Sequence, residues 1–333
     1  MRPSCYNKTM AVKQIILVVL IVMLGVGCAN TEDGMPEEKH AISIAPYTEG
    51  DATRGTPILT ASDLTQIEIH ALRSDSHQPY FTDTARKNPS NNLFTFNTPY
   101  YWLPGASLDF CAITPSAYVS GITCDGRLSF DYCGTAKGGG DDIMTGCAYG
   151  LDYENSQGVV PINMQHTLSM IEFAVAYEED AQGNRVSKIG KDIIITSLGL
   201  KNIAIAGHCQ TYDLNMSWTA EAPVNCVIQD FTEGGTTEGL RVGTDINAGD
   251  VINLPDRSKA FYVIPNQVLT TIQVSFIEGA PTPYTKEIAI TPIHLQPGKH
   301  YIFHLAIKSN EVSVTSTLVT KWTDGGTSEE TFQ

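Results

Sequence analysis

Hydrophobic and polar residues alternate with a period of two in many short runs along the chain. The clearest runs span residues 66–72, 167–175, 192–195, 260–264, 271–276 and 301–307. β-Branched and aromatic residues fill many of the apolar positions, and Gly, Pro, Asn and Asp bound the runs, which is typical of β-strands. The sequence has no long helical stripe with caps at both ends. Many short strands separated by turns predict an all-β fold built from β-sandwiches.

A polar segment, residues 178–191, is the best candidate for a domain boundary, because it has few apolar residues and contains glycines. It divides the chain into halves of similar size. We therefore expect one sandwich over residues 55–183 and a second over residues 184–310, with a separate C-terminal segment at residues 311–333.

The N-terminus is predicted to be a secretory signal, residues 1–27. An apolar run at residues 15–26 follows a basic start and ends in small residues, and it is too short for a membrane span of about 20 residues. Residues 24–28 resemble a bacterial lipobox, although Gly25 stands where Leu is usual. We expect Cys28 to be lipidated and to anchor the chain in the outer membrane; the alternative is a plain signal peptide or an anchor helix.

Acidic residues follow Cys28, and we predict that residues 28–54 form a lipidated tether with a removable first strand. The acidic stretch fits a flexible tether and a surface-export tag equally well. Translation starting at Met1 and translation starting at Met10 are both compatible with the signal.

Composition narrows the class of protein further. The chain has 333 residues with 36 Asp and Glu against 21 Lys and Arg, a net charge of −15. An acidic chain argues against a nucleic-acid partner, which requires a basic face. Because the one long apolar run is N-terminal, a polytopic membrane protein is excluded.

The search for catalytic chemistry is negative. The sequence contains no G-x-S-x-G elbow, no phosphate-binding loop and no H-E-x-x-H motif. His300 and His304 share a face of a predicted strand, but a third metal ligand is not apparent nearby, so we interpret them as polar strand residues. We expect no enzymatic activity, no cofactor and no metal.

Six cysteines follow the N-terminal region: Cys111, Cys124, Cys133, Cys147, Cys209 and Cys226. An exported chain meets an oxidising compartment, so disulfides and buried thiols both remain possible. Cys124 and Cys133 flank an Asp-Gly pair, which makes a bridge closing that hairpin one candidate.

Five local sequences resemble elements of the fimbrillin family, the type V pilus subunits and related lipoproteins of anaerobic bacteria. They are an aromatic-Pro-Gly turn at residues 101–112, an Asp-Ile-Met element at 141–144, a His-Thr-Leu-Ser strand start at 165–171, a Pro-Gly-Lys-His-Tyr turn at 295–301 and a Trp-Gly tail at 321–326. In the turn at 295–301, Pro fixes φ and Gly298 tolerates positive φ. The resemblance covers nearly the whole chain and implies two tandem transthyretin-like, Greek-key β-sandwich domains.

The first strand is predicted over residues 41–47, where Ile42 and Ile44 alternate with small or polar neighbours. A polar linker then leads to Arg54 and Gly55, and an Arg in such a linker is a good site for a trypsin-like protease. The resemblance implies that an Arg-specific protease cuts after Arg54, frees this strand and leaves a groove in the first sandwich. The alternative is an uncut linker.

A long β-prone run at residues 311–322 is the predicted donor strand. We expect this strand to add to the sheet of a neighbouring subunit, where it fills the groove with Val312, Val314, Leu318 and Trp322. Head-to-tail contacts of this kind do not close, so they build filaments. The alternative is a strand that completes its own domain.

These features predict a structural fimbrial subunit that is exported as a lipoprotein, polymerises with other fimbrial subunits at the cell surface and supports adhesion. The alternative is a non-polymerising surface adhesin, or a tip or accessory protein, that binds a glycan or a host ligand. In that case Tyr100, Tyr101 and Trp102 would form an exposed aromatic platform. The alternative is that these residues form a buried turn.

Overall fold

The computed structural model describes residues 39–48, 64–137, 140–212, 215–232, 239–252, 260–279, 282–308, 311–321 and 330–332. Across these residues the chain folds into strands, with one short helix, α1 (Tyr153–Ser156), which confirms the all-β prediction. No helix within the described ranges has the length and apolar character needed to cross a membrane. The predicted residues Cys28, Arg54, Gly55 and Trp322 lie outside those ranges.

The first half of the chain forms an eight-stranded sheet in the order β10-β8-β5-β2-β3-β4-β1-β9. Its strands are β1 (Ser43–Tyr47), β2 (Gln66–Arg73), β3 (Pro79–Lys87), β4 (Phe94–Thr95), β5 (Leu108–Ile113), β8 (Met144–Leu151), β9 (Val159–Asn163) and β10 (Gln165–His166). Because β9 also lies close to β8, the sheet curls around an apolar core. Phe94, Phe110 and Ile67 are completely buried in this core.

A four-stranded sheet in the order β16-β15-β7-β6 packs on the outer face of β5. Its strands are β6 (Val119–Cys124), β7 (Leu128–Cys133), β15 (Ala206–Tyr212) and β16 (Asn215–Ala220). Apolar side chains from both sheets, including Ile113 and Phe130, fill the space between these layers. Both faces of β5 are therefore buried, which explains the apolar run at residues 110–113 within it.

The remaining strands form a second sandwich. One layer has the order β19-β11-β22-β23-β24 and the other β17-β14-β20-β21, with β18 beside β14. The strands are β11 (Ser169–Val175), β14 (Ile193–Ile203), β17 (Val224–Asp230), β18 (Leu240–Arg241), β19 (Ala260–Val263), β20 (Val268–Glu278), β21 (Tyr284–His294), β22 (Lys299–Lys308), β23 (Glu311–Lys321) and β24 (Glu330–Phe332). Ile171, Phe276 and Phe303 lie in the core between the layers.

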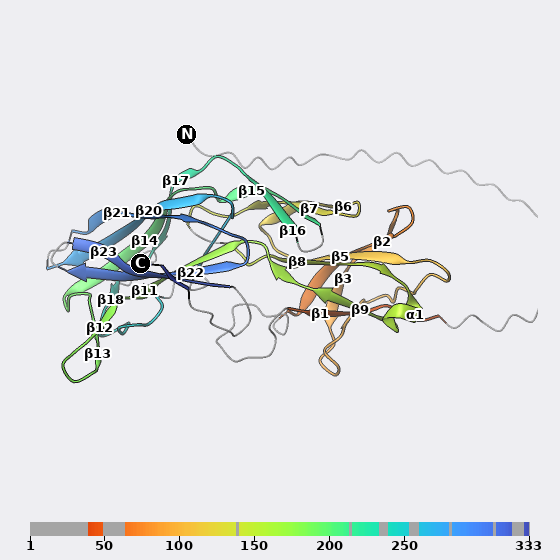
Figure 1. Ribbon diagram of the computed structural model, residues 1–333, viewed down its shortest axis with the longest axis horizontal. Helices are drawn as coiled ribbons and strands as arrows, with labels where there is room; N and C mark the ends of the chain where they lie inside the picture. The colour runs from red at the N-terminus through yellow and green to blue at the C-terminus, as the bar shows by residue number, and fades with distance from the viewer. Residues whose placement is uncertain are drawn as a thin grey trace, which may run out of the picture.

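The two halves exchange strands across the expected boundary. β11 precedes residue 183 and pairs with β22, whereas β15 follows it and pairs with β7. The hairpin of β12 (Tyr177–Glu179) and β13 (Arg185–Ser187) spans the boundary itself. In Figure 1 the molecule is elongated, with β1 and β9 in one half and β21 and β23 in the other. The division at residues 183 and 184 stays a prediction about folding units.

Two local predictions can be checked directly. Gly298 has a φ of 64°, as expected for the second residue of a Pro-Gly turn. The hairpin bridge between Cys124 and Cys133 is wrong, because the register places Cys124 opposite Leu128 and Cys133 opposite Ala206.

Candidate subunit interface

The predicted first strand is present as β1, and it lies inside the sheet rather than at its edge. Ile44 pairs with Phe94 of β4 in antiparallel register, and Ser43 to Tyr47 pair with β9 in parallel register. The Ile42 amide donates to the carbonyl of Tyr100 over 2.8 Å. β1 therefore has hydrogen-bonded partners on both sides.

The side chains of Ile42 and Ile44 anchor β1 in the core. Their exposed fractions are 3% and 0%. They pack among residues of the curled sheet such as Val160 and Ile162. Removing β1 would expose an apolar slot and leave backbone groups of β4 and β9 without partners, which is the kind of edge that accepts another strand.

The predicted donor strand is present as β23, and it pairs with β22 in its own sandwich. The antiparallel ladder runs from Lys308 opposite Glu311 to Lys299 opposite Lys321. On its other side, β23 pairs with β24 over a shorter stretch, Thr317 to Val319.

A bulge in β23 changes which side chains face the core. The register shifts so that Leu305 lies opposite Val314 and His304 opposite Ser316. One extra residue, Thr315, reverses the alternation beyond this point. Val312, Val314 and Val319 pack against the core of the second sandwich, and Leu318 takes the opposite face. A strict period of two would place Leu318 on the same face of the strand as Val314. It would therefore fail to predict that Val319 packs against the core.

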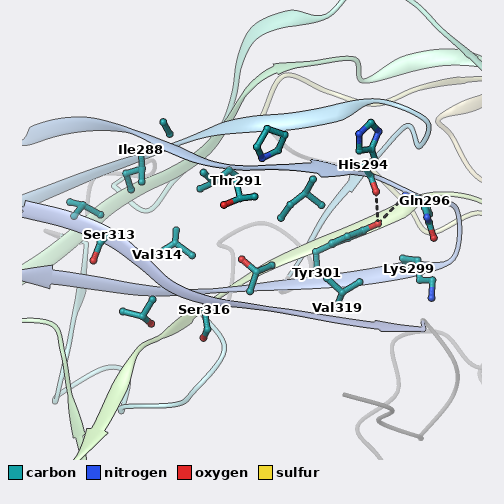
Figure 2. A pocket seen from close by; sticks show the side chains of 17 residues that line it. Ile288, Thr291, His294, Gln296, Lys299, Tyr301, Ser313, Val314, Ser316 and Val319 are labelled. Carbon is teal, nitrogen blue, oxygen red and sulfur yellow. Dashed lines mark hydrogen bonds between the residues drawn. The ribbon is translucent and has the colours of Figure 1, made fainter. Parts of the chain in front are cut away.

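The inward face of β23 lines a cavity of about 720 Å³ between the two layers of the second sandwich. The opposite wall is β21, the last strand of its sheet among the described residues, which contributes Ile288, Ile290 and Ile293. Figure 2 shows Val314 and Val319 on one wall and Ile288 on the other. β23 therefore packs incompletely in its own domain.

Tyr301 borders the cavity near the turn between β21 and β22. Its hydroxyl donates to the carbonyl of His294 over 3.2 Å and accepts from the amide of Gln296 over 3.0 Å (Figure 2). Burial raises the pKa of this phenol above its usual value, so the hydroxyl stays protonated at neutral pH. These bonds fix the turn that joins β21 to β22.

The aromatic platform of the adhesin alternative is not exposed. Trp102 is buried, and the ring of Tyr100 stacks on Phe81 with the centroids 3.9 Å apart. Burial also raises the pKa of the Tyr100 phenol, and the negative charge of the Asp83 carboxylate raises it further. The interpretation as a buried turn holds for Trp102, and Tyr100 is half-buried.

The histidines noted in the sequence make local polar contacts. His300 Nε2 lies 2.8 Å from a carboxylate oxygen of Glu172, and His304 Nδ1 lies 3.1 Å from the hydroxyl of Ser316. Because the two histidines engage different partners on β11 and β23, they are not drawn together into one site.

The fimbrillin-like family's sequence model matches residues 44–322. A fimbrial protein from Bacteroides vulgatus has a similar fold, with a TM-score of 0.53 and 15% identity over 86% of this chain and 100% of that one. A candidate cell-adhesion protein from Bacteroides uniformis also gives 0.53, with 16% identity over 88% and 100%. At these identities the likeness concerns the fold. No curated protein matches the sequence.

Proposed function

Because the chain belongs to the fimbrillin-like family, we propose that it is a structural fimbrial subunit that polymerises by strand replacement. In this proposal β1 is removed by proteolysis, and β23 of a neighbouring subunit takes its place. The slot and the donor lie in opposite halves of an elongated molecule, which suits head-to-tail growth of an open filament (Figure 1).

The observation that carries the proposal is the unequal packing of the two strands. Ile44 of β1 and Ile42 just before it are almost fully buried, whereas Val312 and Val314 of β23 are partly buried beside a cavity of about 720 Å³. A strand that moves from β23's present position into the slot of β1 exchanges incomplete burial for nearly complete burial. Full burial of an aliphatic side chain contributes about 1.5–3 kcal/mol, so two such residues supply a substantial driving force.

Backbone pairing does not drive this exchange, because β23 pairs with β22 over a longer stretch than β1 pairs with β4 and β9. In its own sheet β23 pairs with β22 along its length but with β24 only over Thr317 to Val319. In the slot, β9 offers a partner along Ser43 to Tyr47, and β4 offers one only opposite Ile44. The exchange gives up the ladder with β22 and satisfies the exposed backbone groups of β4 and β9. Burial of side chains therefore has to supply the net driving force.

Processing and anchoring belong to the same proposal. A cut after Arg54 separates β1 from the rest of the chain, so that the strand is held by pairing and burial alone. Lipid on Cys28 holds the uncut subunit at the outer membrane until that cut. A Cys28→Ala variant tests the anchor, because it should lose labelling by an alkyne fatty acid.

Two substitutions on β23 test strand donation. Val314→Asp places a carboxylate where the slot is apolar, and burying an unpaired charge is costly. Ser313→Asp is the matched control, because Ser313 is exposed on the same strand. We expect protease-treated Val314→Asp to stay monomeric and Ser313→Asp to form polymer ladders on a gel. Circular dichroism verifies that both variants fold, and a folded Val314→Asp protein that polymerises normally would overturn the proposal.

A further inference from the structure

Three cysteine sulfurs meet between the layers of the first sandwich. The Sγ of Cys111 on β5 lies 3.0 Å from that of Cys124 on β6 and 3.3 Å from that of Cys147 on β8. Cys111 is completely buried, and the other two are partly buried and pack against the same apolar cluster. The strands come from two layers: β5 and β8 belong to the eight-stranded sheet and β6 to the four-stranded sheet (Figure 1).

Backbone geometry permits a bond within the eight-stranded sheet. Cys111 and Cys147 are directly opposite on antiparallel strands, where Cα atoms stand about 4.5–5.5 Å apart. Disulfides span Cα distances of about 4.4–6.8 Å, so this pair is suitably placed. The Cys124 sulfur is closer still to Cys111 and approaches it from the other layer.

The spacing favours sulfur–sulfur chemistry over metal binding. Thiolates that share a tetrahedral zinc stand roughly 3.8 Å from one another, because each Zn–S bond is about 2.3 Å long. Both measured separations are shorter, at 3.0 Å and 3.3 Å. Three sulfurs can form one disulfide among themselves, which leaves a third sulfur beside it.

We propose that Cys111, Cys124 and Cys147 form a thiol–disulfide exchange site in which Cys111 bonds alternately to Cys124 and to Cys147. The oxidant is an external disulfide, either a small molecule or a protein. The Cys124 thiolate attacks it to form a mixed disulfide and releases one thiol; Cys111 then attacks Cys124 and releases the second thiol. Two cysteine thiols are oxidised and one external disulfide is reduced.

Exchange inside the site needs no further oxidant. The Cys147 thiolate attacks the Cys111 sulfur, the bond from Cys111 to Cys124 breaks, and Cys124 leaves as a thiolate that takes up the proton released by Cys147. The Cys111 sulfur takes part in both bonds, because it lies close to the sulfur of Cys124 and to that of Cys147.

The environment of the thiols assigns Cys124 the first step. The hydrogen bond that it shares with Cys111 lowers the pKa of the Cys124 thiol from its ordinary value of 9.0, against the effect of burial. Hydrogen bonds with Cys124 and Cys147, together with burial, raise the pKa of Cys111. Cys124 is partly buried whereas Cys111 is completely buried, so an external disulfide reaches the sulfur of Cys124 and not that of Cys111.

The two bonds have different mechanical consequences. A bond between Cys111 and Cys124 ties the eight-stranded sheet to the layer that contains β7 and β15. A bond between Cys111 and Cys147 joins neighbouring strands that already pair, so it adds no link between layers. Exchange thus switches a covalent link between layers on and off. This inference does not depend on strand donation.

The test is disulfide mapping on the purified full-length chain. The protein is reduced, exposed to oxidised glutathione, quenched in acid, alkylated, digested and analysed by mass spectrometry. We expect peptides with both linkages in the unsubstituted chain, at amounts within about tenfold of each other. Cys147→Ser should leave only the linkage between Cys111 and Cys124, and Cys124→Ser only that between Cys111 and Cys147.

Two further variants make the outcome decisive. In Cys111→Ala, glutathione should remain attached to Cys124, because the thiol that displaces it is absent. Cys133→Ser is the matched control and should leave both linkages unchanged. Three alkylated thiols after oxidation, linkages mainly to Cys133 or Cys209, or a single linkage that is insensitive to loss of the third cysteine would each overturn the proposal.

Discussion

Ile44 of β1 lies directly opposite Val160 of β9 in a parallel ladder, and neither side chain is exposed to solvent. A strand that is expected to leave the molecule thus contributes to the centre of its core. In the proposed assembly, the peptide link to the rest of the chain holds β1 in place until a cut after Arg54. The proposed cut would convert this part of the fold into a peptide that another strand can displace.

Ile44→Ala tests how firmly β1 is held. Truncating a buried Ile to Ala costs about 2–5 kcal/mol, so the uncut chain should show a clearly lower urea midpoint. After the cut, the weakened strand should leave sooner and polymers should appear earlier. Ser43→Ala, in the same strand but only partly buried, is the control and should change stability by about 0.5 kcal/mol or less. Unchanged assembly kinetics alongside the stability loss would show that release of β1 does not control assembly.

Arg54→Ala tests the processing site. N-terminal sequencing of protein from the cell surface should give Gly55 as the first residue of the unsubstituted subunit. The variant should accumulate as uncut protein that does not polymerise. Arg86→Ala, which alters an exposed Arg within β3, should be processed normally. Filaments whose subunits retain residues 28–54 would argue against this site.

His304→Gln tests a pH dependence at the hairpin of β22 and β23. Burial lowers the pKa of the His304 imidazole from 6.5, and a hydrogen bond from the ring to the backbone of Ser316 acts in the opposite direction. Because the fold favours the neutral ring, this contribution to stability is complete above the unfolded-state pKa and is lost as the pH falls through the folded-state value. The unfolding free energy of the unsubstituted chain should therefore fall more steeply than that of His304→Gln as the pH drops below about 6.5. An equal pH dependence of the unfolding free energy in the two chains would show that His304 does not cause this loss of stability.

Local patterns predicted several of the individual strands. The alternation at residues 66–72 appears as β2 (Gln66–Arg73), and that at residues 301–307 as β22 (Lys299–Lys308). These predictions work because side chains on a half-buried strand alternate between core and solvent. The strand of Ile42 and Ile44 was predictable for the same reason.

Pairing over long sequence distances was not predictable in this way. Nothing near Thr315 in the sequence reveals the bulge that turns Val319, rather than Leu318, toward the core. The meeting of Cys111 with Cys124 likewise depends on two sheets packing together, so the spacing of cysteines suggested the wrong bridge, to Cys133. Register and layer packing are set by the whole fold and leave little trace in a local window.

The most direct test of strand replacement is a photo-crosslink from position 314 in assembled fimbriae. A benzophenone amino acid replaces Val314, whose side chain borders the cavity, and labelled and unlabelled subunits are mixed so that links between chains are recognised by mass. Strand replacement predicts links from position 314 to residues 94–95 or 159–163 of a different subunit. Links confined to residues 288–293 of the same chain would contradict it, because β23 would then have stayed in its own domain.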